Sequence, residues 1–212
     1  MNMKKRPFYN FVKRTFDIFS SFVGLLLIWW LLLILAIIVK CSSKGPVFFK
    51  DKRVGRLGKT IYVLKFRTMY ADAESNIDKY LTPEQKLIWE TERKLDNDPR
   101  ITKIGRFLRK TSLDELPQLI NIFNGTMSVV GPRPITTKEL EENYTLDDQK
   151  LLVSVRPGLI SNWGVNGRNN VVFETGERQK LELEYFKKMG LFYDLKLLFK
   201  SIFVVLKREG AK

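Results

Sequence analysis

Two adjacent carboxylates, Asp114 and Glu115, lie in the segment 111–118, which reads Thr-Ser-Leu-Asp-Glu-Leu-Pro-Gln. The basic stretch 106–110 comes just before them, and the pattern predicts that the pair stands at the start of a helix. Backbone N–H groups and the positive end of the helix dipole attract phosphate at such a place. Aspartate carboxylates can act as nucleophiles toward phosphoryl groups. The segment therefore indicates phosphoryl chemistry.

A simpler interpretation of the same residues is a capping box, in which Ser112 and Glu115 satisfy the first backbone donors of the helix. That motif is common, and it does not need Asp114. A carboxylate pair beside Arg109 is also more than a cap requires. Because phosphoryl transfer needs its charge neutralised, we expect Mg²⁺ to be held by Asp114 and Glu115.

Phosphate oxygens also need cationic side chains held in fixed positions, and arginine can contact two oxygens at once. Candidate residues lie in segments stiffened by proline or glycine, or in the motif 65–69. They are Lys65, Arg67, Arg133, Arg156 and Arg168. Any one of them alone would more often be a surface or ion-paired residue. Several of them together, with a carboxylate pair, favour a phosphate site.

The composition limits the other chemistries. The chain has no histidine, which excludes Ser-His and Cys-His catalysis and histidine metal sites. Acid–base chemistry must then use carboxylates, lysine, tyrosine or water. The one cysteine, Cys41, excludes an internal disulfide and fits a reducing compartment.

Residues 18–39 carry no charge and are long enough to cross the hydrocarbon core as a helix. No small-residue cleavage site follows, so we interpret the segment as a permanent membrane element rather than a secretory signal. Lysines and arginines flank it on both sides, and a straight span would place one cluster on the wrong side of the membrane. A re-entrant hairpin, helped by polar or small residues near 20–24, would keep both clusters in the cytoplasm.

The net charge of +14 suggests nucleic acid at first sight. Residues 1–60 carry +10 and residues 187–212 carry +5, whereas residues 61–186 carry −1. A nucleic-acid-binding domain would carry its basic stripe on the folded body. Charge that flanks an apolar segment fits anionic membrane lipids better, so we expect no nucleic-acid partner.

The periodicity predicts an α-rich α/β (α+β) fold with short strands and amphipathic interfacial helices, preceded by the re-entrant membrane hairpin. We assign residues 1–44 to the membrane anchor and 45–212 to a small cytoplasmic catalytic domain. The predicted strands are 47–50 and 60–66, and the predicted helices are 83–95, 105–110, 112–123, 174–189 and 191–207. Residues 131–134 and 156–168 are predicted to be loops. The apolar face of 191–207 fits either the core or the membrane interface.

The chain resembles the bacterial sugar transferase family, the monotopic phosphoglycosyl transferases that start polysaccharide and glycoconjugate assembly. The resemblance covers nearly the whole chain, in the family's order. It is carried by Lys13-Arg14 with Asp17, Gly45–Phe49, Lys65–Met69, Asp98–Thr102, Ser112–Asn121, Gly131–Pro134, Arg156–Gly158 and Val165–Arg168. Larger members add several transmembrane helices ahead of this unit, which we expect this chain to lack.

The resemblance implies a phosphotransferase on the cytoplasmic face of the bacterial inner membrane. Asp114 would attack the β-phosphate of a UDP-sugar, release UMP and carry the phospho-sugar to a polyprenyl phosphate such as undecaprenyl phosphate. Glu115 would assist with Mg²⁺, Arg109 and Arg168 would contact the nucleotide or its phosphates, and Arg133 would shape the site. Downstream glycosyltransferases would use the product for capsule or exopolysaccharide, and a homodimer is one open oligomeric state.

Two departures from the family pattern stand out. Trp29-Trp30 occupies the place of the usual proline break in the apolar segment, and residues 159–164 differ in the loop that follows Arg156. Two other functions stay open: a membrane-tethered nucleic-acid binder, and a non-catalytic membrane scaffold. Under the scaffold interpretation, Asp114→Asn would change neither activity nor partners.

Overall fold

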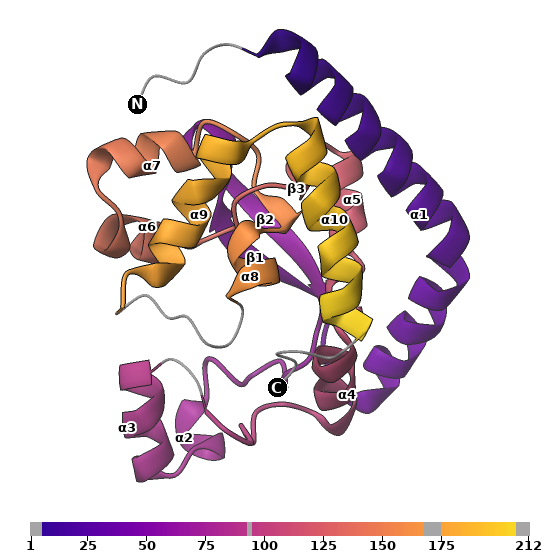
Figure 1. Ribbon diagram of the computed structural model, residues 1–212. Helices are drawn as coiled ribbons and strands as arrows, with labels where there is room; N and C mark the ends of the chain where they lie inside the picture. Colours follow the sequence, from indigo (N-terminus) through magenta and orange to yellow (C-terminus); the bar gives the residue numbers. More distant parts are fainter. Residues whose placement is uncertain (1–5, 93–94, 168–174, 207–212) are drawn as a thin grey trace. The chain divides into compact units, whose positions relative to one another are not determined.

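The computed structural model describes residues 6–92, 95–167 and 175–206, and helices predominate in it over short strands (Figure 1). The chain divides into two units that each pack internally. Unit 1 consists of residues 1–28, 50–64 and 117–210, and unit 2 consists of 29–49, 65–116 and 211–212. The helix-rich fold with short strands is confirmed. The division into an anchor at 1–44 and a domain at 45–212 stays a prediction.

The elements follow one another along the chain as short segments after one long helix. The helices are α1 (Pro7–Ser42), α2 (Ile77–Tyr80), α3 (Pro83–Glu92), α4 (Lys103–Thr111), α5 (Gln118–Phe123), α6 (Thr137–Asn143), α7 (Leu146–Leu152), α8 (Asn162–Asn166), α9 (Glu177–Lys188) and α10 (Leu191–Leu206). The strands are β1 (Phe48–Val54), β2 (Thr60–Phe66), β3 (Ser128–Val130) and β4 (Gly158–Ile160), and 3-10 turns lie at Arg56–Gly58 and Leu113–Glu115.

Helix α1 is continuous from Pro7 to Ser42 and is long and apolar enough to cross a membrane. The re-entrant hairpin is not confirmed. The hydroxyls of Ser20 and Ser21 donate to the carbonyls four residues earlier, at 2.7 and 2.6 Å, a pattern that often bends a helix without breaking it. The apolar helix is confirmed, and its course through a membrane stays a prediction.

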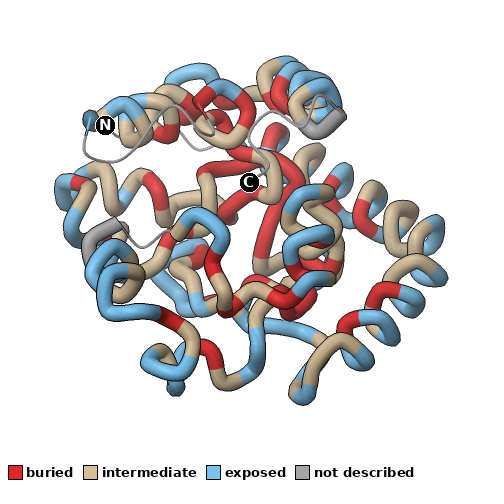
Figure 2. The backbone as a smooth tube through the Cα atoms, turned by 90° about the horizontal axis from the view of Figure 1, so that it is seen from below, coloured by how far each residue is buried: buried red, intermediate tan, exposed pale blue. Residues whose placement is uncertain are grey.

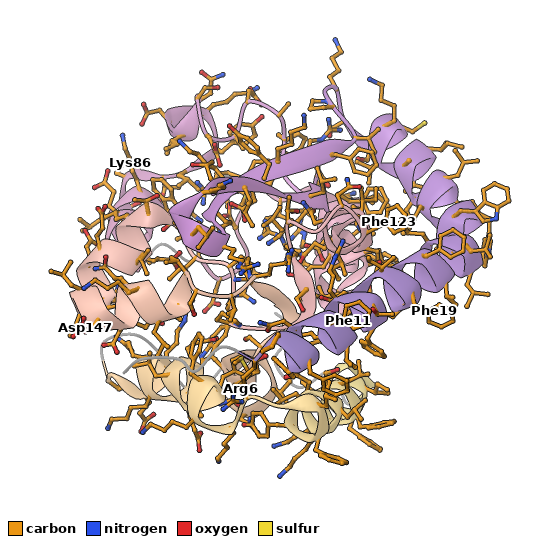
Figure 3. All side chains as sticks on the ribbon, turned by 90° about the horizontal axis from the view of Figure 1, so that it is seen from above. Arg6, Phe11, Phe19, Lys86, Phe123 and Asp147 are labelled. Atoms are coloured by element: carbon orange, nitrogen blue, oxygen red, sulfur yellow. The ribbon has the colours of Figure 1, made fainter. Side chains whose placement is uncertain are left out.

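One face of α1 is buried and the opposite face is exposed (Figure 2). In unit 1, Asp17 is buried and accepts hydrogen bonds from Ser128 Oγ at 3.0 Å and from the backbone N of Val129 at 2.9 Å. In unit 2, Leu35 and Val39 pack in the core. The exposed apolar residues recur every three or four positions: Phe8, Phe11, Phe16, Ile18, Phe19, Phe22, Leu26, Leu27, Trp29, Trp30, Leu33, Ile34, Ile37 and Ile38. Phe11 and Phe19 extend from the ribbon in Figure 3.

The core of unit 1 lies between the strands and the C-terminal helices. Val63, Ile122, Met127 and Tyr185 are among its most deeply buried side chains. Strands β1 and β2 form one sheet, and β3 pairs with β4 in parallel, with Ser128 opposite Gly158. The parallel pair is joined through α6 and α7, so it brings distant segments of the chain together.

The core of unit 2 is smaller. Leu35, Val39, Phe66 and Leu108 are buried together, and Met69 forms an isolated antiparallel bridge with Ile101. Helix α4 is amphipathic and places Leu108 in this core, with 0% of its surface exposed. This core is therefore the support for the segment that follows α4.

Several predicted elements need correction. Residues 112–123 do not form one helix: Ser112 adopts the left-handed conformation (φ 56°) and ends α4, a 3-10 turn covers Leu113–Glu115, and α5 begins at Gln118. The capping box is also wrong, because the Ser112 side chain makes no capping bond to the turn that follows. The predicted loop 156–168 contains β4 and α8, and the strand predicted at 47–50 runs from Phe48 to Val54. The helices predicted at 105–110, 174–189 and 191–207 are confirmed with small shifts of their ends.

The apolar face of helix α10 is mostly exposed. Phe192 is 91% exposed and Phe199 is 61% exposed, whereas Leu197 is buried. Most of the apolar face predicted from the sequence therefore points away from the core of unit 1. Of the two interpretations, the exposed face fits the membrane interface.

Candidate active site

The carboxylate pair lies in the 3-10 turn Leu113–Glu115, between the end of α4 and the start of α5. The left-handed Ser112 turns the chain sharply, and its backbone N donates to the carbonyl of Arg109 at 3.1 Å. The helix start predicted for the pair is confirmed only as a short 3-10 turn, which follows the C-terminal end of α4 and precedes α5. The turn presents both carboxylates without using them as caps.

Asp114 has an unusual electrostatic environment. Burial raises the pKa of its carboxyl group to about 6, and the neighbouring Glu115 adds to that rise. Lys65 and Arg109 oppose it by favouring the charged form. The Nζ of Lys65 lies 3.8 Å from Oε1 of Glu115. Unit 2 therefore brings together four predicted site residues, and perturbed carboxyl groups of this kind gather at functional sites.

Arg109 is half-buried beside the pair. Its Nε donates to Oγ1 of Thr68 at 2.9 Å. Burial lowers the pKa of its guanidinium, while the charges of Asp114 and Asp98 act against that effect. The group stays charged and is in place to contact an anion.

The other predicted basic residue of unit 2 has a different role. The guanidinium of Arg67 donates to the carbonyls of Pro46 at 2.6 Å, Ser43 at 2.7 Å and Val39 at 3.1 Å. These bonds satisfy one carbonyl in the last turn of α1 and two in the segment that follows it. Substrate binding by Arg67 stays a prediction that none of these contacts supports.

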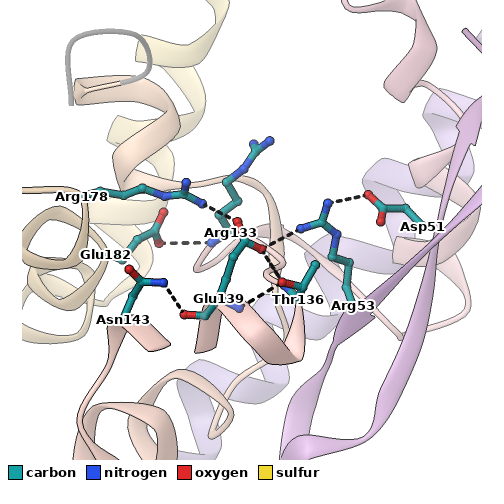
Figure 4. A network of polar contacts seen from close by, with 8 residues as sticks. All are labelled: Asp51, Arg53, Arg133, Thr136, Glu139, Asn143, Arg178 and Glu182. Atoms are coloured by element: carbon teal, nitrogen blue, oxygen red, sulfur yellow. Dashed lines mark hydrogen bonds and ion pairs between the residues drawn. The ribbon is translucent and has the colours of Figure 1, made fainter. Parts of the chain in front are cut away.

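Arg133 lies in unit 1, in the loop between Pro132 and Pro134. Its backbone N donates to Oε2 of the buried Glu182 at 3.1 Å, and its guanidinium lies 5.0 Å from the ring centre of Trp163. Figure 4 shows that guanidinium extending away from the polar network that holds the loop. Burial raises the pKa of Glu182. The network fixes the loop, and the guanidinium of Arg133 extends away from it.

The same network contains residues that sequence reasoning missed. Glu139 accepts from Arg53 Nη1 at 3.1 Å and lies 3.7 Å from Arg178 Nη2 (Figure 4). The guanidinium of Arg178 is also 4.4 Å from the ring centre of Trp163. Glu139 also completes a capping box with Thr136 at the start of α6. Arg53 and Arg178, by contrast, belong to no motif identified in the sequence. One indication of this network was present in the sequence: Trp163 lies in the segment 159–164, which differs from the family pattern.

The loops of Arg133 and Arg156 meet because two glycines allow close approach of the backbones. A Cβ on Gly158 would lie 2.1 Å from the backbone N of Gly131. The Nε of Arg156 donates to the carbonyl of Gly125 at 2.7 Å, and burial lowers the pKa of its guanidinium. Arg156 thus braces its own loop. Arg168 lies outside the described residues.

A second pair in unit 2 had no predicted role. Asp98 and Arg100 are both buried, and Arg100 Nη2 lies 2.7 Å from Asp98 Oδ2. Arg100 also lies 4.8 Å from the ring centre of Trp89. These contacts shape the loop that leads into α4.

The fit to a divalent cation was tested on the same residues. Within the described parts of the chain, no group of three or more His, Cys, Asp or Glu side chains could hold a metal by itself. Mg²⁺, however, is commonly bound by one or two carboxylates together with substrate phosphates. The half-buried pair Asp114 and Glu115 fits that second arrangement.

The sequence is similar to a described family over nearly all its length. The family model of the bacterial sugar transferases matches residues 8–208. An exopolysaccharide production protein ExoY of Rhizobium meliloti is 41% identical over 210 residues, which cover 97% of this chain and 90% of that protein.

Two further relatives are longer than this chain. An undecaprenyl-phosphate galactose phosphotransferase of Salmonella typhimurium is 43% identical and covers 99% of this chain, but the match spans 43% of its own length. An uncharacterized sugar transferase of Haemophilus influenzae is 45% identical over 94% of this chain and 42% of its own length. The chain thus spans less than half the length of these two relatives.

Proposed function

The chain belongs to the bacterial sugar transferase family, and on that premise we propose that it transfers a sugar 1-phosphate from a UDP-sugar to a polyprenyl phosphate. The product would be a polyprenyl diphosphate sugar, with which polysaccharide synthesis begins. The name of the Salmonella relative, an undecaprenyl-phosphate galactose phosphotransferase, supports this reaction class. The name of the Rhizobium relative supports a role in exopolysaccharide production.

The observation that carries the proposal is the state of Asp114. With a pKa of about 6, its carboxyl group is largely ionised at neutral pH, yet it is more basic than an ordinary aspartate. Its half-buried position limits the water that would solvate the charge. A carboxylate of this kind is suited to attack phosphorus, provided that cations reduce the repulsion between the two anions.

Each step can be assigned to residues of this chain. An oxygen of Asp114 attacks the β-phosphorus of the UDP-sugar, and the bond from that phosphorus to the oxygen of UMP breaks. An oxygen of polyprenyl phosphate then attacks the phosphorus of the aspartyl adduct, and the Asp114 carboxylate leaves. Arg109 and Lys65 stabilise the charge that builds up on the phosphate oxygens.

Glu115 has two roles in this proposal. It raises the basicity of Asp114, and it shares with Asp114 the binding of Mg²⁺. When bound, Mg²⁺ neutralises charge on the phosphates. Arg133 and Arg156, together with Arg168, are proposed to contact substrate phosphates or the nucleotide.

We further propose that α1 does not cross the membrane straight. Asp17 and Ser21 pack within unit 1, and Val39 packs within unit 2, so globular structure contacts the helix near each end of the apolar segment. The exposed apolar stripe is free to enter the bilayer. A re-entrant or in-plane helix, with the exposed face of α10 at the interface and anionic lipids near the flanking cations, keeps the catalytic residues on the cytoplasmic face.

The single cysteine makes this disposition testable. Cys41 is exposed, and Asn10→Cys in a Cys41→Ser background places an exposed thiol at the other end of α1. With a membrane-impermeant maleimide, neither thiol should react in intact cells and both should react in inverted vesicles. Labelling of one thiol from outside intact cells would show a straight span and contradict the proposal.

The transfer reaction is tested by intact mass. Purified protein is incubated with a panel of UDP-sugars and Mg²⁺, without a lipid acceptor. We expect a mass increase of one phospho-sugar and release of UMP, both absent in Asp114→Asn. Polyprenyl phosphate should then discharge the adduct. If no UDP-sugar gives either an adduct or UMP, the covalent mechanism is wrong, and the scaffold interpretation gains.

A further inference from the structure

Thr68 accepts hydrogen bonds from both ends of α4, with its backbone carbonyl at one end and its hydroxyl at the other. It is buried, with 7% of its surface exposed. Its backbone carbonyl accepts hydrogen bonds from Thr102 N at 3.0 Å and Thr102 Oγ1 at 3.4 Å, where α4 begins. Its hydroxyl accepts from Arg109 Nε at 2.9 Å, near the end of the helix. One residue therefore serves both docking of the helix and orientation of a cation.

The docking depends on the backbone of Thr68. A Cβ on Gly105 would lie 1.9 Å from the Thr68 carbonyl oxygen, so α4 approaches that backbone as closely as only glycine allows. Thr102 Oγ1 caps the helix by accepting from Gly105 N at 2.9 Å. Because Arg109 is four residues after Gly105, it lies on the same face of α4. Removing the Thr68 hydroxyl would leave the backbone contacts of this docking in place.

The Thr68 hydroxyl sets the orientation of the Arg109 guanidinium plane. Among the residues that the structure describes, Thr68 is the one side-chain hydrogen-bond partner of Arg109, and it takes Nε. The two terminal amino groups stay available. Fixing Nε fixes the plane in which those amino groups can contact two oxygens of one phosphate. Asp114 is close enough for its charge to act on Arg109.

We propose that Thr68 is a positioning residue for the transfer reaction, whose hydroxyl orients the Arg109 guanidinium toward the donor phosphate beside Asp114. The inference rests on the proposed function for the identity of that phosphate. The bond from Arg109 to Thr68 is a separate feature that can be measured without any substrate. The competing role for Thr68 is only structural, as a buried residue that supports α4.

The matched variants are Thr68→Val, which keeps the shape and removes the acceptor, and Thr68→Ser, which keeps the hydroxyl. We expect Thr68→Val to form the phospho-sugar adduct about 10- to 100-fold more slowly, the usual effect of losing a hydrogen bond to a charged group. Thr68→Ser should retain most of the rate. In an Arg109→Lys background, Thr68→Val should add little, because lysine has no Nε to orient.

Two comparisons separate positioning from support. Thr68→Ser keeps the acceptor of the bond from Arg109 Nε, so it should restore the rate that Thr68→Val loses. A purely structural role would lower the melting temperature of Thr68→Val, and its effect on the rate would multiply with that of Arg109→Lys.

The bond itself is measured by NMR on protein labelled with ¹⁵N-arginine. The Nε–H of Arg109, assigned with Arg109→Lys, should exchange slowly with solvent in wild type and fast in Thr68→Val. Wild type that forms no adduct overturns the proposed function and the role of Thr68 in transfer with it. Wild type that forms adduct, with Thr68→Val matching its rate, overturns the role of Thr68 alone.

Discussion

Unit 2 contains two aspartates near arginines, Asp98 and Asp114, and the protein treats them in opposite ways. Burial by itself would raise the pKa of Asp98, but the side-chain and backbone hydrogen bonds of Arg100 hold it below the usual range. For Asp114, burial and the charge of Glu115 raise the pKa to about 6. Arginine is close to both carboxylates, but it forms hydrogen bonds to Asp98 alone.

The difference lies in the hydrogen bonds rather than in the net charge nearby. Asp98 Oδ1 accepts from Arg100 N at 2.9 Å and from Arg100 Nε at 3.0 Å, and Oδ2 accepts from Arg100 Nη2 at 2.7 Å. Arg109, by contrast, uses Nε on Thr68 and acts on Asp114 through charge. A carboxylate whose lone pairs are filled is structural, whereas one held near cations without strong bonds keeps its lone pairs for reaction.

The largest effect should come from breaking the buried ion pair of Asp98 with Arg100, which should lower the stability of the fold. Asp98→Ala leaves the Arg100 guanidinium buried without its partner, and we expect a loss of about 3–5 kcal/mol in the free energy of unfolding. Thermal or denaturant unfolding at pH 7 measures it. The stabilisation by Asp98 exists above the ordinary pKa of aspartate and is lost as pH falls through its lowered value, so the gap to wild type should close in acid.

The double variant Asp98→Ala with Arg100→Leu is the control, because it removes both charges and should recover part of the loss. If the single and double variants unfold alike, the pair is not the source of the stability.

The next effect should come from moving the reactive carboxylate without removing it. Asp114→Glu adds one methylene, and a displacement of about 1 Å at a reacting atom can cost about 100-fold in rate. Single-turnover formation of the adduct measures it. Asp98→Glu is the matched change in the ion pair of Asp98 with Arg100. It should lower the free energy of unfolding and have little effect on the rate of adduct formation. The comparison fails if Asp98→Glu slows the chemistry as much as Asp114→Glu.

A smaller effect concerns stability at the reactive site. Because the folded pKa of Asp114 is raised from 3.8 to about 6, its contribution to stability is complete below about pH 4 and is lost as pH rises through 6. Asp114→Asn should therefore stabilise the protein above pH 6, by about 1–2 kcal/mol after allowance for partial solvent exposure. The gain in melting temperature should disappear near pH 4. A loss of stability at pH 7.5 would contradict the raised pKa.

The smallest effect concerns the cation that lies near the pair. Lys65 lowers the pKa of Asp114, so Lys65→Gln should move the acid limb of adduct formation upward from about pH 6, by less than about one unit. Lys86, which pairs with Asp78 at 2.6 Å on the surface of unit 2 (labelled in Figure 3), offers the matched control Lys86→Gln. An equal shift in both variants would assign the effect to net charge alone.

The proximity of Arg109, Asp114 and Glu115 could be predicted because they are close in sequence, whereas Lys65 is distant and was a candidate only through its motif. The turn that presents the carboxylates could not be predicted. A serine in the left-handed region at position 112 has no strong sequence signal, since that conformation favours glycine. The sequence therefore predicted that these residues belong to one site, but not the left-handed Ser112 and the 3-10 turn on which the carboxylates lie.

Thr68 and Asp98 show what local patterns leave out. Each acts through a buried hydrogen bond that depends on tertiary packing. The motifs 65–69 and 98–102 carry the family resemblance, but they do not reveal these bonds. The parallel pairing of β3 and β4 has the same origin, because Gly131 and Gly158 are distant in sequence and meet only in the fold. Helices α4, α9 and α10 were predictable because their periodicity and end residues are local.

The bond between Asp17 and the start of β3 has a consequence for biosynthesis. Asp17 is made 111 residues before its partner Ser128. At a synthesis rate of about 5–20 residues per second, its carboxylate waits about 5–20 s for its partners, beside an apolar helix that has already emerged. The first part of α1 can therefore reach its final packing only late in translation. Until then, the nascent chain must keep a charged side chain at the border of a membrane segment, in water or with a helper protein.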